Sequence, residues 1–240
     1  MEPFRFKQFS LSHSRSAMHV NTDSVLLGAW TNGPSNKPCR ILDIGTGCGI
    51  LALMMAQRFA GAGIDAMEID ACAAEEAAAN VLSSPWADRI FVHKADFRNT
   101  VFTHPYDLVI CNPPYFSQSL ASPDRRRTMA RHTSGESLPR RELIEGVAHL
   151  LADDGLFSLV LPVAEAREFF STAAMACKPL FVQRITTVYT KSHKPALRIL
   201  AQLGRNPVSV VQDTIVMYQD NGREYSPQYV ALVRDFYLWA

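Results

Sequence analysis

The sequence lacks the features that mark a metal centre, a disulfide framework or a membrane anchor. No CxxC pair occurs, and the cysteines are odd in number and scattered: Cys39, Cys48, Cys72, Cys111 and Cys177. We therefore expect reduced thiols, no disulfide and no metal site. No apolar run is long enough to span a membrane, and the first residues, MEPFRFKQFSLSHSR, contain no apolar signal core. These absences predict a soluble, cytoplasmic protein.

An excess of one charge is also missing. The 240 residues carry a net formal charge of +1, so any nucleic-acid contact must depend on a local basic patch. Hydrophobic residues make up 48% of the chain, which is enough for a core and does not indicate disorder. Neither an internal repeat nor a linker interrupts the sequence. We expect a single domain, 1–240.

From residue 40 onward, short apolar runs alternate with helical patterns. Strands are predicted at 40–44, 64–69, 90–94, 106–111 and 156–162, and helices at 50–59, 70–84, 138–151 and 164–177. This alternation predicts a mostly parallel sheet covered by helices on both faces. Three closely spaced β-rich segments follow near 180–189, 196–203 and 208–218, and we expect them to pair antiparallel because no helical crossover fits between them. A last amphipathic stretch, 226–240, is predicted to be helical, with Pro227 in its first turn.

A glycine turn, LDIGTGCG, joins the first of these strands to the first of these helices. Gly45, Gly47 and Gly49 fit an ordinary tight turn, and they also resemble the GxGxxG fingerprint that binds a dinucleotide. The third glycine, however, comes one residue early. Asp43, two residues before the loop, is a poor neighbour for a pyrophosphate but suits a ligand with an ammonium or sulfonium group. This turn therefore favours a cationic ligand.

Two further acids follow the next two predicted strands. Glu68 ends the second strand, where a carboxylate can accept hydrogen bonds from both ribose hydroxyls. Asp96, next to Phe97, follows the third strand, where it can accept from the amine of an adenine. Each acid alone fits a solvated strand end equally well. Because ligands bind at the carboxyl ends of an open α/β sheet, the three acids together predict S-adenosylmethionine rather than NAD.

The segment NPPY follows the fourth predicted strand, at the edge of the same crevice. A ring-attached amine is a poor nucleophile because its lone pair is delocalised. The Asn112 oxygen and the Pro113 carbonyl can each accept one of its N–H groups, and Pro114 keeps that backbone rigid. Tyr115 offers a face for stacking a planar target. We assign no catalytic His or Cys, since the product loses its proton after transfer.

These motifs resemble the class I S-adenosylmethionine-dependent methyltransferases that carry [DN]PP[YF], over about residues 20 to 205. That group methylates exocyclic amines of adenine or guanine, or the glutamine amide of release factors. The resemblance implies a Rossmann-like, three-layer αβα sandwich around a mostly parallel seven-stranded sheet with an antiparallel last strand. It also implies S-adenosylmethionine as the cofactor.

A narrower resemblance is to the bacterial tRNA (adenine-N6)-methyltransferases, which modify adenine 37 of a valine tRNA. It is carried by FRFKQFSLSHSRSAMHVNTDSVLLGAW, SSPWADRI, NPPYF and ARHT. The resemblance implies that an N-terminal extension, 1–36, covers the cofactor and substrate site of a core at 37–240. It adds Asn21, Thr22 and Asp23 as cofactor-side candidates. The apolar residues 25–30 are expected to form an ordinary buried helix.

Two basic segments are candidates for phosphate contact. One lies in the long loop after NPPY, and the other in the turn TKSHKP. The predicted RNA-binding residues are Arg125, Arg126, Arg127, Arg131, Lys191 and Lys194. Charge runs are more often solvated surface, but this loop directly follows the predicted methyl-accepting crevice. We expect tRNA as the partner and no obligate protein partner.

Three other functions remain open. A release-factor glutamine methyltransferase would share the catalytic turn, but such enzymes usually carry an N-terminal helical module, and only about 40 residues precede the glycine turn here. A DNA adenine methyltransferase would need a sizeable target-recognition domain. A non-catalytic S-adenosylmethionine-binding module would have no reason to retain all four NPPY residues.

Overall fold

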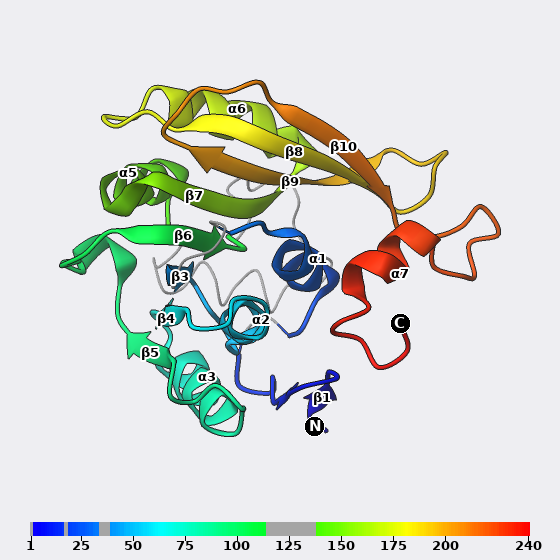
Figure 1. The fold of residues 1–240 in the computed structure, drawn as a ribbon, viewed down its shortest axis with the longest axis horizontal. Helices are drawn as coiled ribbons and strands as arrows, with labels where there is room; N and C mark the ends of the chain where they lie inside the picture. The colour runs from blue at the N-terminus through cyan, green and yellow to red at the C-terminus, as the bar shows by residue number, and fades with distance from the viewer. Residues whose placement is uncertain (1, 17–18, 34–38, 114–137) are drawn as a thin grey trace.

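A computed structural model of the chain describes residues 2–16, 19–33, 39–113 and 138–240. An eight-stranded sheet lies between two layers of helices, which makes a three-layer αβα sandwich (Figure 1). The strands of this sheet are β3 (Arg40–Ile44), β4 (Gly63–Glu68), β5 (Ile90–Lys94), β6 (Tyr106–Cys111), β7 (Leu151–Pro162), β8 (Phe181–Tyr189), β9 (Ala196–Gly204) and β10 (Val211–Val216). The helices are α1 (Thr22–Trp30), α2 (Ile50–Arg58), α3 (Ala71–Leu82), α5 (Arg140–Leu150), α6 (Val163–Ala174) and α7 (Pro227–Val233), with a short 3-10 helix, η1 (Phe97–Asn99).

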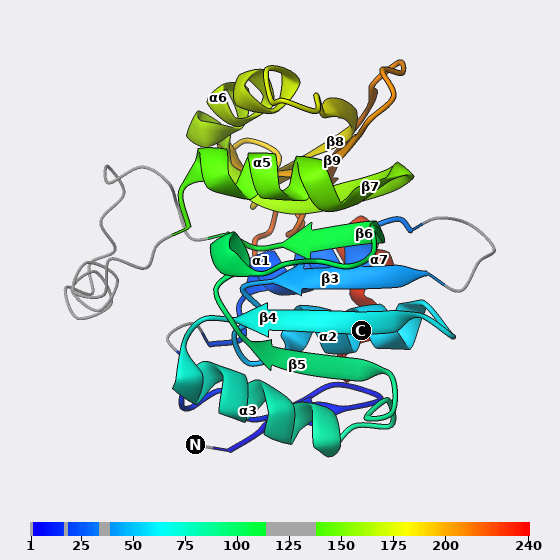
Figure 2. The ribbon, with the colours of Figure 1, turned by 90° about the vertical axis from the view of Figure 1, so that its left-hand side faces the viewer.

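The strand order places a switch point in the middle of the sheet. The order is β5-β4-β3-β6-β7-β9-β8-β10, so the chain starts at β3, moves outward to β5, and then returns to β6 on the other side of β3. Figure 2 shows β3 to β6 pointing the same way, with their carboxyl ends at one edge. Ile44 pairs with Cys111 at the end of these two central strands. The residues that follow them, Gly45 and Asn112, are therefore neighbours at the switch point, where open α/β sheets bind ligands.

The sheet has the eight strands that the sequence pattern predicted, one more than the resemblance implied, and its last strand corrects an expected pairing. β9 is antiparallel to both β7 and β8, as expected for the seventh strand. β10, however, pairs with β8 in parallel. β9 inserts between β7 and β8, so β8 is the strand with a free edge, and β10 pairs with it. The chain reverses direction twice between β8 and β10, so these two strands run the same way. The close spacing of these segments correctly predicted that the chain reverses direction between them, but it did not predict which strand β10 pairs with.

Alternate side chains of the central strands enter two separate cores. Ile41, Leu108 and Ile110 join the core beneath α1, α2 and α7, whereas Leu42 and Val109 join the core beneath α5 and α6. This period of two is the geometry of any strand, and burial on both faces explains the continuous apolar runs. Asp43 lies two residues beyond Ile41 and therefore faces the side of α1 and α2.

Helix α1 is buried almost all round. Asn21 caps it, accepting a hydrogen bond from the Ser24 N–H at 2.9 Å, and residues 24–30 are all buried. The helix packs against α2, α7 and β7, so it has no wide polar face. The prediction of a buried helix at 25–30 is confirmed.

The two ends of the chain pack against each other on the α1 and α2 side. β1 (Phe4–Arg5) and β2 (Ser10–Leu11) form a hairpin, and Phe6 bridges to Tyr237. α7 begins at Pro227 as predicted but ends at Val233, well short of residue 240. The remaining aromatic side chains stack instead: the rings of Tyr237 and Trp239 lie 5.0 Å apart. Stacking between these rings takes the place of the last helical turns predicted here.

Candidate functional site

The glycine turn has the backbone that only glycine adopts easily. Gly45, Gly47 and Gly49 have φ angles of 70°, 57° and 88°. A Cβ built on Gly45 or Gly47 would meet no atom of the described residues within 4 Å. The backbone conformation, and not crowding from the protein, therefore accounts for these two glycines. The space above them leaves the turn open to close approach by a ligand.

Asp43 braces this turn from below. Its side chain is fully buried, and its Oδ2 accepts hydrogen bonds from Thr46 Oγ1 at 2.6 Å and from the Ala52 N–H at 3.1 Å. Burial raises the pKa of the Asp43 carboxyl to about 7. Its Oδ1 has no hydrogen-bond partner within the described part of the chain. The predicted contact with a cationic ligand is not tested by these contacts and stays a prediction.

Glu68 connects the glycine turn to the end of β4. Its Oε2 accepts from the Gly47 N–H at 2.9 Å, and its Oε1 accepts from the Asp70 N–H at 3.0 Å. A carboxylate has about four lone-pair sites, so two remain for other donors. Glu68 thus keeps the capacity to accept from ribose hydroxyls.

Asp96 stands two residues beyond β5 and is held by an arginine. Its Oδ2 accepts from Arg98 Nη2 at 2.7 Å, and its Oδ1 accepts from Arg98 Nε at 2.9 Å. The hydrogen bond from the Arg98 side chain lowers the pKa of Asp96 below its usual value. The adjacent Phe97 is buried, and a Cβ on Gly146 of α5 would come within 2.4 Å of its ring. Any contribution of Phe97 to a cofactor site would come from its backbone, because its ring packs under α5.

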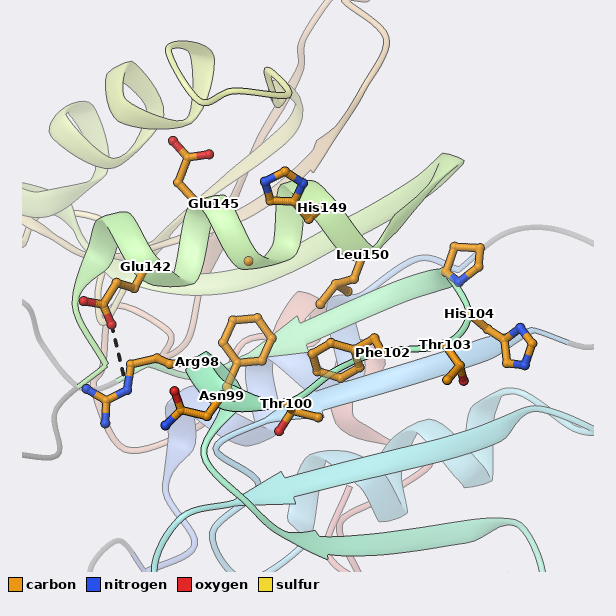
Figure 3. A pocket seen from close by; sticks show the side chains of 13 residues that line it. Arg98, Asn99, Thr100, Phe102, Thr103, His104, Glu142, Glu145, His149 and Leu150 are labelled. Carbon is orange, nitrogen blue, oxygen red and sulfur yellow. Dashed lines mark ion pairs between the residues drawn. The ribbon is translucent and has the colours of Figure 1, made fainter.

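A cavity of about 1030 Å³ lies beyond Arg98, along the outer side of α5 (Figure 3). Residues 97–100 and 102–105 and several residues of α5 line it, and two of these residues, Arg98 and Glu142, form an ion pair at 3.8 Å. Neither the glycine turn nor Asn112 is among its lining residues. Of the predicted site residues, only Phe97 lines this cavity, and sequence patterns did not point to it.

Asn112 follows β6 and is held through its amide. Its Nδ2 donates a hydrogen bond to Ser24 Oγ at 2.9 Å. Pro113, next along the chain, is buried. Pro114 and Tyr115, the other two predicted catalytic residues, lie outside the described residues.

The predicted N-terminal contributors lie at the start of α1. Asn21 is the cap, Thr22 is exposed, and Asp23 Oδ2 accepts from Arg198 Nε of β9 at 2.9 Å. Sequence reasoning stopped at these three and missed Ser24, the residue that touches Asn112. The only sign of Ser24 in the sequence is a small hydroxyl residue directly before an apolar run, and this does not indicate which residue it contacts.

A second contact missed by sequence reasoning holds the N-terminal segment on α3. Glu76, 4% exposed, accepts hydrogen bonds from the N–H groups of residues 14–16. Asn80 donates both to the Ser12 carbonyl and to the Cys48 carbonyl in the glycine turn. Burial raises the pKa of Glu76, but the hydrogen bonds that Glu76 accepts from the Ser16 hydroxyl and from the N–H groups of residues 14–16 outweigh burial and lower the pKa overall. The segment before α1 is therefore joined to the glycine turn through one helix.

The predicted RNA contacts divide into two groups. Lys191 and Lys194 lie in the turn between β8 and β9. Because β8 runs parallel to β7 and β6, this turn is at the same edge of the sheet as Asn112. The other four, Arg125, Arg126, Arg127 and Arg131, fall outside the described residues. In the residues that the structure describes, no group of three or more His, Cys, Asp or Glu could hold a metal ion, and no helix is long and apolar enough to cross a membrane.

Comparison with known proteins gives one consistent picture. The family model described as the methyltransferase small domain matches residues 17–162. A Tolumonas auensis protein is 44% identical over 236 residues, covering 98% of this chain and 96% of its own length; one from Bacteroides fragilis is 42% identical, covering 98% and 97%. Both are named tRNA1(Val) (adenine(37)-N6)-methyltransferase.

Among solved structures, a predicted O-methyltransferase from Agrobacterium tumefaciens superposes with a TM-score of 0.67 at 20% identity, covering 89% of this chain and 96% of its own. The ribosomal protein L11 methylase of Lactobacillus delbrueckii subsp. bulgaricus gives a TM-score of 0.52 at 16% identity, covering 77% of each chain. At these identities the likeness concerns the fold alone. That fold is the Rossmann-like sandwich expected from the sequence.

Proposed function

We propose that this chain, which belongs to the tRNA1(Val) (adenine(37)-N6)-methyltransferase family, transfers a methyl group from S-adenosylmethionine to N6 of adenine 37 in a valine tRNA. One observation supports the chemistry above all others. The pairing of Ile44 with Cys111 makes Asn112 and the open glycine turn follow two adjacent strands. This arrangement supports the proposal that Asn112 accepts from the target amine close to the methyl donor.

The residues at the edge of the sheet suit S-adenosylmethionine. The open backbone at Gly45 and Gly47 and the two spare lone-pair sites of Glu68 are the groups that would hold it. Asp96 already accepts from Arg98 and Asn99, so the adenine amine would replace one of these donors. Bound there, S-adenosylmethionine supplies an electrophilic methyl group on a sulfonium. Asp23 and Asp43 remain candidates for the methionine end.

The role of the NPPY residues is to make the adenine amine nucleophilic. Asn112 Oδ1 and the Pro113 carbonyl each accept one N–H, which draws the nitrogen toward a tetrahedral geometry and frees its lone pair for attack. No base is needed before attack, because the methylated amine carries the surplus proton and releases it to water afterwards. The acceptors act by fixed position and charge, which is the most effective use of preorganised groups.

The tRNA must present its adenine outside the stack of the anticodon loop. Turning a base outward costs a few kcal/mol, and stacking on Tyr115 is proposed to offset this cost. Lys191 and Lys194, at the same edge as Asn112, and the arginines at 125–127 and 131 are the proposed phosphate contacts. A tRNA substrate places the proposed reaction in the cytoplasm.

The test is methyl transfer to two acceptors at once. The purified protein is incubated with methyl-labelled S-adenosylmethionine, total tRNA and total protein, both from cells that lack this enzyme. We expect label in N6-methyladenosine after digestion of the tRNA. A valine tRNA transcript with guanine in place of adenine at position 37 is the matched control and should remain unlabelled.

Two results would contradict the proposal. Label in protein would identify a glutamine methyltransferase that shares the NPPY turn. No label in either acceptor, with the cofactor still bound in calorimetry, would indicate a non-catalytic binding module.

A further inference from the structure

We propose that Ser24 is a positioning residue that sets which end of the Asn112 amide faces the adenine. The inference rests on the proposed function, and it deepens the role given there to Asn112. Asn112 Nδ2 donates to Ser24 Oγ at 2.9 Å, across 88 residues of chain. Ser24 thereby occupies the donor end of the amide and leaves the acceptor end, Oδ1, for the substrate.

The chemistry makes this orientation decisive. An asparagine amide has an oxygen that accepts and an NH₂ that only donates, and rotation by 180° exchanges them. The adenine N6 amine brings two N–H donors. If the amide were reversed, its NH₂ would face these donors, and the nitrogen lone pair would stay delocalised into the ring. A serine hydroxyl can accept or donate, and in the structure Ser24 Oγ accepts from Nδ2. We infer that this choice keeps Oδ1 turned toward the substrate and prevents that loss.

Ser24 is itself held firmly from two directions. Its side chain is 6% exposed, and its N–H donates to the Asn21 side chain at 2.9 Å in the cap of α1. The preceding residue, Asp23, is bonded to Arg198 of β9 at 2.9 Å. The first turn of α1 is therefore tied to the sheet edge on which Asn112 stands. The hydroxyl has a defined place before any substrate arrives.

An alternative role would be purely structural, with the bond only attaching α1 to the end of β6. The two roles predict different measurements. A structural attachment would lower the stability and the affinity for S-adenosylmethionine together with the rate. Orientation of the amide would lower the rate of methyl transfer alone.

The experiment uses the full chain in single-turnover methylation of the valine tRNA. Ser24→Ala is expected to lower the transfer rate about tenfold, the size of one net hydrogen bond, with the Kd for S-adenosylmethionine and the KM for tRNA changed less than about twofold. Ser24→Thr keeps the hydroxyl and should restore most of the rate. Thr31→Val is the matched control: it removes another buried hydroxyl of the same helix region, bonded to the Leu27 carbonyl at 2.8 Å, and should leave the rate unchanged.

A double variant distinguishes orientation from every other contribution of Ser24. In Asn112→Asp both side-chain oxygens accept, so the orientation of the group no longer matters. Ser24→Ala should then cost less than about twofold when it is added to Asn112→Asp. An equal cost in both backgrounds would overturn the proposal, as would an unchanged rate in Ser24→Ala alone or an equal fall in rate and cofactor affinity.

Failure of this inference is separable from failure of the proposed function. If the wild-type chain labels no tRNA, the proposed function fails before any variant is compared. If the wild type forms N6-methyladenosine and Ser24→Ala does so at the same rate, only the role of Ser24 is wrong.

Discussion

The glycine turn at 45–49 and Asn112 follow adjacent strands at one edge of the sheet, but different parts of the chain hold them. The contacts of Asp43 with the turn are local: it accepts from Thr46 and Ala52, three and nine positions away, and Glu68 and Asn80 add contacts from 21 and 32 positions away. Asn112 takes its side-chain contact from Ser24, 88 positions away. A motif with local geometry can be recognised from its sequence, whereas the orientation of the Asn112 amide, the proposed acceptor, depends on the fold around it.

The largest effect is expected from Asn112→Ala. This change removes one of the two proposed acceptors for the adenine amine and should lower methyl transfer about 100- to 1,000-fold, as loss of one preorganised group does in other enzymes. Affinity for S-adenosylmethionine should stay within a few-fold of wild type in calorimetry, because the glycine turn has its own contacts. Loss of cofactor binding instead would show that Asn112 supports the glycine turn, so the turn and the amide would not be held independently.

The local brace can be tested through its pH dependence. Burial raises the pKa of Asp43 from 3.8 to about 7 in the folded chain, so unfolding releases a proton between these values. The free energy of unfolding should therefore fall as the pH rises from about 4 to about 7 and level off above, by up to about 4 kcal/mol. Asp43→Asn lacks this term, so the difference between the two proteins in urea melts should follow the same curve. If the difference in unfolding free energy does not change with pH, Asp43 is not a buried carboxyl with a raised pKa.

A smaller effect is expected from replacing single glycines. Two such variants distinguish the backbone strain of the turn from its proposed contact with the cofactor. Gly47→Ala and Gly61→Ala both place an alanine at positive φ, 57° and 81°, with open space around the new Cβ among the described residues. Each should cost about 1–2 kcal/mol of stability. Only Gly47→Ala should also weaken S-adenosylmethionine binding, by about tenfold, because Gly61 lies in the loop after α2. Equal cofactor affinities in the two variants would remove the turn from the binding site.

The smallest effect is expected at the edge of the proposed tRNA surface. Replacing Lys191 and Lys194 with alanine should weaken tRNA binding a few-fold and reduce the slope of log K against log salt by about 0.7–0.9 for each phosphate that the protein no longer neutralises. Lys178→Ala is the matched control, since this exposed lysine precedes β8 at the opposite edge of the sheet. A filter-binding curve that moves equally for both would indicate only a general effect of charge.

Much of the fold follows from local patterns. Strands β3 to β6 were predicted to within a residue or two, because apolar runs end at Gly, Pro or Asp and helices begin at residues such as Asp70. The direction of β10 and the length of α7 could not be obtained in this way. Which edge is free depends on where β9 inserts, and the last helical turns compete with aromatic stacking against the N-terminal hairpin.

The candidate site divides along the same line. Parallel strands place their carboxyl ends together, so the residue types of the switch point, Gly45 to Gly49, Glu68, Asp96 and Asn112, could be named from the sequence by itself. Ser24 and Glu76 could not, because a hydrogen bond between segments 60 or more residues apart leaves no spacing in the sequence. The sequence by itself determined the strands, the glycine turn and the position of Asn112 after β6, since these depend on backbone preferences and short-range pattern. Only the tertiary structure decided which way the Asn112 amide faces, because a partly buried side chain takes its orientation from the partner that the fold brings within about 3 Å.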